Sequence, residues 1–191
     1  LGFEPSEDAA KYSRKHGVNV VNDFFSSKMA MPYGKFDVVH MNTVIEHVPD
    51  PRGLVDEVIR VLKLGGLFCV ISPNEYNPLQ EVLRKQLGFK PWWISPPQHL
   101  NYFDFKSIGG LLKSRGLSIV DSLGTFPMEF FLLAGRNYVG DDKVGRRCQL
   151  ERKTFESNMY AGDSEALNNI YRALGTHGVG RQFILIAQKL R

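Results

Sequence analysis

The chain has 191 residues, of which 43% are hydrophobic and 23% are charged, and its formal net charge is +4. This length fits one domain with a sizeable core, and the composition is that of an ordinary globular protein. Apolar runs such as Phe130–Gly135 are far too short to cross a bilayer, which excludes a membrane span of the helical kind.

The basic residues are scattered among acids, and no helix-turn-helix, zinc-finger or RNA-binding signature is present. We therefore expect a solvated basic surface and no nucleic-acid partner. Cys69 lies inside an apolar run, so we expect a free buried thiol, which fits the reducing cytoplasm. With only two cysteines and no histidines at ligand spacing, the sequence predicts no metal site.

Short β-rich runs alternate with amphipathic stretches, a pattern typical of an α/β protein with a parallel sheet covered by helices. In chain order, we expect a helix over 7–16 and strands over 18–22 and 36–41. A helix that starts at 51 and ends at Gly65-Gly66 then leads into a strand over 67–72 and a looser segment over 73–103. A helix from 105 that ends at Gly116, a strand over 117–123, a helix around 164–174 and a final strand over 183–189 complete the chain. The sequence therefore predicts a single domain over residues 1–191, with an insertion at about 125–180 between the last two strands.

Three polar or aromatic side chains follow predicted strands: Glu4 follows the end of a strand over residues 1–3, and Asp23 and Phe24 follow the strand over 18–22. Ligands of open α/β sheets bind beyond the carboxyl ends of the strands. Glu4 offers two acceptor oxygens, which match the two hydroxyl groups of a ribose. Asp23 can accept a hydrogen bond from an exocyclic amine while Phe24 stacks on a purine. A surface carboxylate before a helix and a turn-forming aspartate are equally compatible with these positions.

The most specific pattern lies in the middle of the chain. It consists of EHVPDP at 46–51, RVLKLGG at 60–66, SPN at 72–74 and PPQHL at 96–100, followed closely by Phe103. Together with Glu4, these segments resemble class I S-adenosylmethionine (SAM)-dependent methyltransferases of the small-molecule, ubiquinone-biosynthesis-like type. The resemblance covers roughly residues 1–123 and the final strand, and Leu64 stands where that family usually has proline.

The resemblance implies a Rossmann-like methyltransferase sheet with an antiparallel last strand, S-adenosyl-L-methionine as cofactor and a small-molecule acceptor. It implies that Glu4 holds the ribose, that Asp23 and Phe24 contact the adenine, and that Met41 and Asn42 line the methionine end of the cofactor. The expected reaction is methyl transfer to the acceptor, a hydroxyl rather than an amine. A hydroxyl acceptor gains from a general base.

His47 and His99 are the two candidates for this base, because a histidine side chain titrates near neutral pH. A structural hydrogen-bonding role is equally open for each. Trp92, Trp93 and the segment around 126–138 are expected either to shape the acceptor pocket or to anchor the loop that carries them.

One feature of the resembled family is not found. Its first strand leads into a Gly-x-Gly-x-Gly loop that lets the backbone approach the cofactor, whereas the nearest pattern here, Gly178-Val179-Gly180, precedes the last predicted strand. We therefore expect a domain that is incomplete at its N-terminus, lacks the first strand and binds SAM weakly or not at all. The sheet edge left open should rearrange or be buried in a homodimer.

Two alternatives stay open at this point. A non-catalytic relative could use the same fold for binding alone, and the chain itself could be inactive. An NAD-dependent α/β protein is disfavoured, because such proteins have no counterpart of the EHVPDP and VLKLGG segments.

Overall fold

The computed structural model describes residues 1–190, and its six strands form two separate sheets. β1 (Gly2–Phe3) and β2 (Val20–Val21) pair in parallel as a two-stranded sheet. The second sheet has four strands in the order β3 (Phe36–Asn42), β4 (Leu62–Pro73), β6 (Gln182–Lys189) and β5 (Leu117–Gly124). This mixed α/β architecture confirms the predicted fold class.

The last strand runs against its neighbours, as predicted. β3 and β4 are parallel, whereas β6 is antiparallel to both β4 and β5. Within residues 1–190, β3 pairs with β4 alone, so its other edge is unpaired, and β1 pairs with β2 instead. The described strands therefore form no single seven-stranded sheet. Only one copy of the chain is described, so burial of the open edge in a homodimer stays a prediction.

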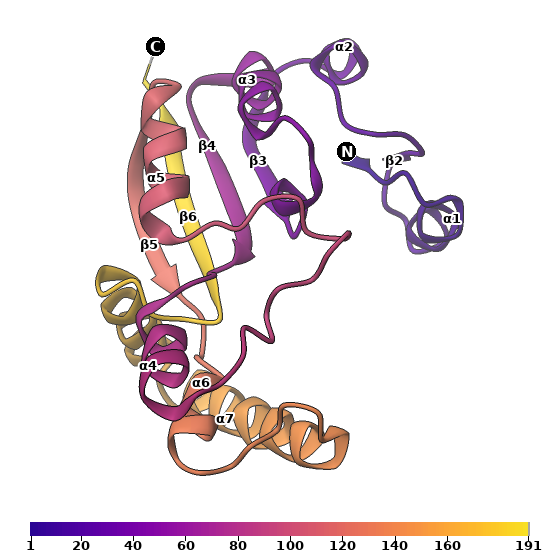
Figure 1. Cartoon of the computed structure of the whole chain (residues 1–191). Helices are drawn as coiled ribbons and strands as arrows, with labels where there is room; N and C mark the ends of the chain where they lie inside the picture. Colours follow the sequence, from indigo (N-terminus) through magenta and orange to yellow (C-terminus); the bar gives the residue numbers. More distant parts are fainter. Residues whose placement is uncertain (191) are drawn as a thin grey trace.

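Two helices cover one face of the four-stranded sheet (Figure 1). α3 (Pro51–Val61) contributes Val55 and Val58 to the core, and α5 (Phe105–Ser114) contributes Ile108 and Leu112. The sheet side of this core consists of alternate residues along the strands, which are Met41, Phe68, Val70, Phe183, Leu185 and Ala187. The period of two along each strand explains why these side chains share one face.

Both helices begin where the sequence predicts. The Asp50 carboxylate accepts a hydrogen bond of 2.9 Å from the Gly53 amide, and Pro51 occupies the first turn. The Asp104 carboxylate accepts a bond of 2.7 Å from the Ser107 amide, and the Ser107 hydroxyl in turn accepts from the Asp104 amide. These caps satisfy amide groups that have no partner inside the helix.

The predicted end of α3 was wrong. The helix stops at Val61, and the Gly65-Gly66 pair lies inside β4 rather than closing the helix. A Cβ atom at Gly66 would come within 3.2 Å of the Asp37 carbonyl on β3. The absence of a side chain at Gly66 therefore permits close approach of two strands.

Several elements were not predicted. α4 (Pro78–Leu87) lies in the segment expected to be loose, and its N-cap Asn77 forms a capping box with Gln80. Shorter elements are α2 (Ser27–Ala30) and the 3₁₀ helices η1 (Met31–Tyr33) and η2 (Ile45–His47). The first helix, α1 (Glu7–Lys15), matches its prediction.

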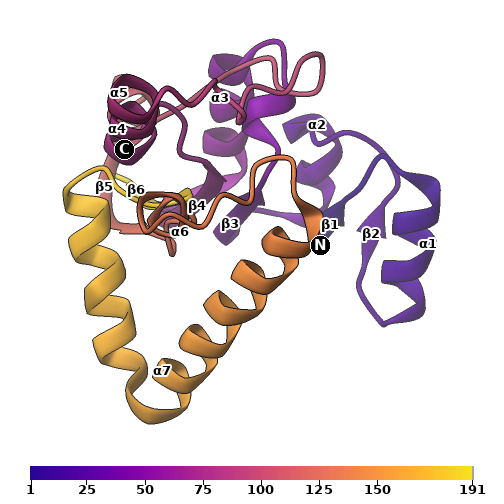
Figure 2. The ribbon, with the colours of Figure 1, turned by 60° about the horizontal axis from the view of Figure 1, so that its bottom comes forward.

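The residues between β5 and β6 form α6 (Glu129–Leu133) and the long α7 (Asp142–Thr176). α7 is kinked at Asp163, where φ is −156° and ψ is 89°, and its two halves form a V (Figure 2). The Asp163 carboxylate caps the second half by accepting a 2.8 Å bond from the Ala166 amide. The predicted helix around 164–174 lies within this second half. We expected an insertion within a single domain here, and this interpretation of α6 and α7 stays a prediction.

Three glycines allow the end of α7 to contact the end of β5. A Cβ atom at Gly124 would overlap the Val179 carbonyl oxygen, and one at Gly175 would lie 2.7 Å from the Ser122 carbonyl oxygen. Gly180 has a φ of +142° and lies against the backbone of Gly124. The backbone of this junction is therefore packed too closely for any side chain.

None of the described helices contains a stretch that is both apolar and long enough to traverse a lipid bilayer.

The junction gives a stability prediction. Gly124→Ala is expected to lower the free energy of unfolding by about 2–4 kcal/mol, because the new methyl group overlaps a backbone carbonyl that cannot move aside. Gly109→Ala is the matched control: a Cβ atom there meets nothing within 4 Å, and alanine favours the α5 helix by about 0.5–1 kcal/mol. Urea unfolding measures both variants, and an unchanged midpoint for Gly124→Ala would contradict the packing described.

Candidate active site

A short 3₁₀ helix, η2, places the first candidate base directly after the carboxyl end of β3. The chain turns sharply at Thr43, whose φ is 50°, and the Thr43 amide donates to the Ile71 carbonyl at the end of β4. Ile45 is fully buried and fixes η2 on the core. His47 therefore lies at the end of the sheet where two parallel strands finish.

Glu46, next to this histidine, connects three segments of the chain. Its side chain is buried, and its Oε2 accepts a 2.8 Å hydrogen bond from the Ser72 hydroxyl on β4. Its main-chain carbonyl accepts bonds of 2.8 and 3.0 Å from the amides of Leu100 and Asn101. The Asn101 side chain also donates to the Val48 carbonyl at 2.7 Å. The PPQHL loop is thereby held against η2.

The two predicted candidate bases meet at this contact. The ring centroids of His47 and His99 are 5.0 Å apart and the rings are nearly perpendicular. His47 Nδ1 lies 2.6 Å from the Gln98 carbonyl oxygen, which can only accept, so Nδ1 carries the proton. In the neutral ring, Nε2 then has a free lone pair, and it lies 3.7 Å from Glu46 Oε1.

This Glu46–His47–His99 cluster offers two kinds of chemistry. A neutral His47 can take up a proton at Nε2, with the Glu46 carboxylate stabilising the charged ring that results. One ligand atom from each of the three residues also lies within 4.8 Å of the other two, a spacing that can hold a metal ion. The sequence does not reveal this spacing, because His99 comes from a separate loop. Glu46 was not predicted as a site residue.

The two tryptophans belong to a group of aromatic rings. Trp92 and Trp93 have ring centroids 4.8 Å apart, and Tyr76 contacts Trp93 edge-on at 5.6 Å. Trp93 is buried, whereas Trp92 is partly accessible. The contacts of Trp93 support its role as an anchor of the loop, and a role in shaping an acceptor pocket stays a prediction for Trp92.

The residues predicted to hold the adenosine lie at the ends of β1 and β2. Glu4 Oε1 accepts a 2.8 Å bond from the Ser6 amide, which leaves Oε2 for a ribose hydroxyl. Asp23 is exposed, and its Oδ1 accepts from the Phe24 amide at 2.7 Å. The Phe24 ring is 75% exposed, which is unusual for so apolar a side chain and leaves its faces free for stacking. That Glu4, Asp23 and Phe24 hold the adenosine stays a prediction.

The other two predicted cofactor residues, Asn42 and Met41, differ in their exposure to solvent. Asn42 is exposed at the end of β3. Met41 is buried in the hydrophobic core beneath α3, so any contact it makes with a cofactor has to come from its main chain. Both roles stay predictions.

A second group of buried polar side chains lies just beyond β4 and was not predicted. Glu75 and Glu129 are both buried, and the Gln80 amide lies between them, 3.4 Å from Glu75 Oε2 and 3.1 Å from Glu129 Oε1. Burial is the main cause that raises the pKa of Glu75 to about 7; the Gln80 hydrogen bond opposes it, and the Glu129 and Glu46 carboxylates raise it further. The only sequence signal was the polar string that follows Pro73.

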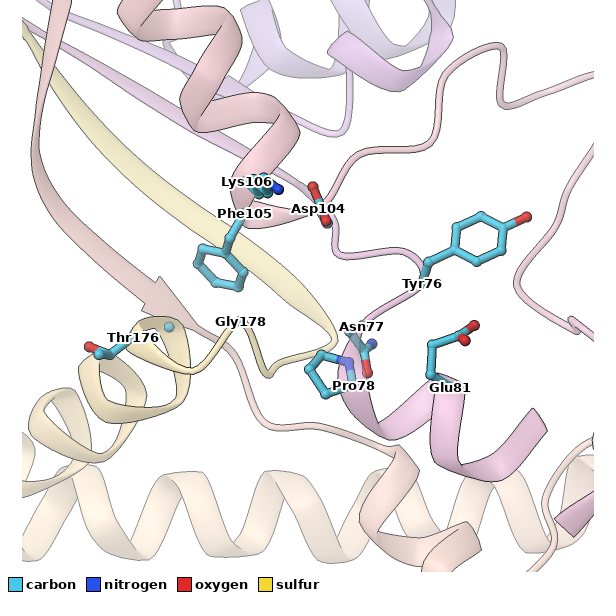
Figure 3. Close-up of a pocket in the computed structure, with 10 residues that line it drawn as sticks. Tyr76, Asn77, Pro78, Glu81, Asp104, Phe105, Lys106, Thr176 and Gly178 are labelled. Atoms are coloured by element: carbon cyan, nitrogen blue, oxygen red, sulfur yellow. The ribbon is translucent and has the colours of Figure 1, made fainter. Parts of the chain in front are cut away.

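A pocket of about 520 Å³ opens beside this group, between the starts of α4 and α5 and the end of α7 (Figure 3). Tyr76 and Glu81 line it on the α4 side, and Lys106 lines it on the α5 side. None of the predicted cofactor or catalytic residues lines this pocket, so it is separate from the Glu46–His47–His99 cluster.

Comparison with known proteins defines the class of the chain. Residues 1–122 match the family described as a methyltransferase domain, so the chain belongs to that family of SAM-dependent enzymes. S-adenosyl-L-methionine is the cofactor of the family. The predicted family, fold and cofactor are thus confirmed.

Two relatives are similar over part of their length. A probable S-adenosylmethionine-dependent methyltransferase of Mycolicibacterium smegmatis is 31% identical over 102 residues, which are 52% of this chain and 35% of the relative. A ubiquinone biosynthesis O-methyltransferase of Escherichia fergusonii is 35% identical over 87 residues, which are 44% of this chain and 36% of the relative. The matches thus span about a third of the length of these relatives.

Solved structures share the fold. A SAM-dependent methyltransferase from Thermotoga maritima, described as a possible histamine N-methyltransferase, has a TM-score of 0.56 at 18% identity; the alignment covers 99% of this chain and 72% of that one. A SAM-dependent methyltransferase from Archaeoglobus fulgidus has a TM-score of 0.55 at 17% identity, covering 98% and 75%. At these identities the likeness shows the Rossmann-like fold alone.

The raised pKa of Glu75 predicts how stability depends on pH. The folded chain keeps the Glu75 proton up to about pH 7, whereas an unfolded glutamate releases it near its ordinary value of 4.5. The free energy of unfolding should therefore fall by about 1–3 kcal/mol between pH 4.5 and 7.5. Glu75→Gln, measured by urea unfolding at several pH values, should remove this decline.

Glu81→Gln is the control for this measurement. Two basic neighbours, Arg84 and Lys85, lower the pKa of Glu81 to about 2, so its substitution should leave the decline between pH 4.5 and 7.5 in place. If the free energy of unfolding of Glu75→Gln still declines between pH 4.5 and 7.5, another group causes the decline.

Proposed function

We propose that this methyltransferase domain transfers the methyl group of SAM to a hydroxyl oxygen of a small-molecule acceptor. The observation that carries the proposal is the Glu46–His47–His99 cluster, which lies beside the carboxyl end of β3 with a free imidazole nitrogen. The family membership of residues 1–122 and the O-methyltransferases among the similar proteins support it.

In this proposal the cofactor is held from one side by residues at the ends of β1 and β2. Glu4 Oε2 accepts from the ribose, and Phe24 stacks on the adenine while Asp23 accepts from its amino group. Asn42 and the main chain of Met41 face the methionine end. When bound, SAM supplies a methyl group on a positively charged sulfur, which is already a reactive donor. The main tasks of the protein are therefore alignment of the acceptor and exclusion of water.

The proposed role of His47 is to take the proton that the hydroxyl loses as its oxygen gains the methyl group. Gln98 fixes the ring orientation through Nδ1, so the proton is accepted at Nε2. The nearby Glu46 carboxylate stabilises the imidazolium that forms. His99 contacts the edge of the His47 ring and limits its rotation.

The acceptor is proposed to bind between this cluster and the segment that follows β5. Phe126, Phe131 and Tyr138 form a small apolar group with Met128 on that segment. Trp92 lies on the loop that precedes His99, so its accessible ring can contact the same acceptor. These aromatic residues favour an acceptor with an apolar body.

Methyl transfer is tested with tritiated SAM and a panel of small phenols and amines as acceptors. We expect transfer to phenols with a millimolar KM for SAM, because the sequence holds no glycine-rich loop to contact the methionine end. Glu4→Ala should raise that KM about tenfold, the cost of one charge-assisted hydrogen bond of ~1.5 kcal/mol.

Glu7→Ala is the matched control. Glu7 is an exposed acid on α1, paired with Lys11, and its loss should leave the KM unchanged. Transfer only to amines would contradict the hydroxyl acceptor, and an unchanged KM in Glu4→Ala would contradict the ribose contact. Absence of transfer to every acceptor would favour a non-catalytic binding module.

A further inference from the structure

We propose that the buried pair of carboxylates formed by Glu75 and Glu129 is a binding site for the ammonium group of a small amine. The two acids come from separate parts of the chain, because Glu75 lies just after β4 and Glu129 begins α6. Binding of the amine stands independently of methyl transfer. That the amine is part of the methyl acceptor rests on the proposed function, and it narrows the acceptor class to hydroxyl compounds that also carry an amine.

The two carboxylates receive few hydrogen bonds, and most of these are long. Glu75 and Glu129 are 6% and 3% exposed, and an ionised carboxylate has about four positions at which it accepts a hydrogen bond. Within residues 1–190, their donors are two side-chain amides. Gln80 Nε2 lies 3.4 Å from Glu75 Oε2 and 3.1 Å from Glu129 Oε1, and Asn77 Nδ2 lies 3.4 Å from Glu129 Oε1. Bonds to a charged oxygen are normally about 2.7–2.9 Å long, so the pair lacks donors.

One oxygen of the pair has no partner. Glu129 Oε2 is buried and makes no hydrogen bond within residues 1–190. Because Glu129 Oε1 contacts the amides of Asn77 and Gln80, which are themselves buried, the carboxylate is directed into this polar group and away from solvent. A buried charged acceptor without a donor is costly. An ammonium group offers three donors, enough for Glu129 Oε2 and an oxygen of Glu75 together.

The missing positive charge selects an ammonium group over a neutral hydroxyl. Burial is the main cause that raises the pKa of Glu75 to about 7; the Gln80 hydrogen bond and the charge of Arg181 oppose it, and the Glu129 and Glu46 carboxylates add to it. The side chain of Arg181, the one cation among these causes, is exposed. A hydroxyl group donates a hydrogen bond, but only a cation also relieves the repulsion between the two carboxylates.

An amine reaches the pair from the pocket beside it. Tyr76 and Asn77 line this pocket of about 520 Å³ (Figure 3), and Tyr76 directly follows Glu75 in the chain. Asn77 belongs to both the pocket and the polar group, because its amide contacts Glu129. Tyr76 is 48% exposed, and its ring packs edge-on against that of Trp93. Aromatic rings beside paired carboxylates favour a cation, because the faces of the rings carry partial negative charge.

The pair lies close to the proposed catalytic histidine. Ser72, which bonds Glu46, and Glu75 are three residues apart at the end of β4. Three residues span at most about 11 Å, so one small molecule can reach from His47 to the pair. In the proposed reaction, the pair holds the ammonium group of the acceptor while His47 takes the proton of its hydroxyl group. The pair itself takes no part in the proton transfer.

Calorimetric titration in the absence of SAM tests the amine site. The two probes are phenethylamine and 2-phenylethanol, which carry an ammonium or a hydroxyl group at the end of the same chain, at about pH 8, where Glu75 is ionised. We expect one saturable site for phenethylamine and binding at least tenfold weaker for 2-phenylethanol. Glu129→Gln should weaken phenethylamine binding about tenfold, because it removes a charge-assisted contact.

Glu151→Gln is the matched control. It makes the same change of charge as Glu129→Gln, but the Glu151 carboxylate on α7 already pairs with Arg136 and Arg147. It should leave phenethylamine binding unchanged, and circular dichroism verifies the fold of both variants. Equal binding of the two probes, no saturable binding of phenethylamine, or unchanged binding in Glu129→Gln would each overturn the amine site. Glu75→Gln, which removes the other charge, should weaken binding in the same way.

The acceptor class is tested separately, by methyl transfer to the hydroxyl group of tyramine and of 4-ethylphenol, which lacks the amine. We expect a kcat/KM about tenfold higher for tyramine, and loss of this preference in Glu129→Gln. Equal use of the two phenols would overturn the assignment of the amine to the acceptor. Absence of transfer to both, with phenethylamine binding intact, would overturn that assignment together with the proposed function and leave the amine site standing.

Discussion

A single buried carboxylate organises the candidate active site. Glu46 lies at the end of β3, where its carboxylate bonds Ser72 on β4 and its carbonyl accepts two amides of the PPQHL loop. A charge out of contact with water is costly unless it is paired or hydrogen-bonded. The PPQHL loop and β4 are therefore held in an arrangement that provides hydrogen bonds to Glu46 Oε2 and to the Glu46 carbonyl. In this arrangement His99 contacts His47.

The proposed proton transfer depends on the one carboxylate oxygen of Glu46 that this arrangement leaves unsatisfied. Glu46 Oε1 faces the lone pair of His47 Nε2 and makes no hydrogen bond within the described chain. Such a pair stabilises positive charge on the His47 ring when the ring gains a proton. In the proposed reaction, this proton comes from the hydroxyl acceptor. The second acidic group, around Glu75, affects the pH dependence of stability and takes no part in this chemistry.

The sequence predicts the local features of the fold well. Asp50 and Asp104 identify the starts of α3 and α5, because a cap depends only on residues within one turn. The place of Gly66 was misjudged, because one of its close contacts is with Asp37 on β3, which is distant in sequence. Glu46 was missed for the same reason: its partners Ser72 and Leu100 are distant in the chain, and no local pattern shows that a carboxylate is buried.

The tautomer of His47 tests the central role of Glu46 most directly. Long-range ¹H–¹⁵N correlation spectra of the protein distinguish the two neutral forms of the ring. The structure predicts a proton on Nδ1, bonded to the Gln98 carbonyl, and a bare Nε2 facing Glu46. A proton on Nε2 would mean that His47 donates to Glu46, which would leave Nε2 no lone pair to accept a proton and would contradict the proposed role of His47.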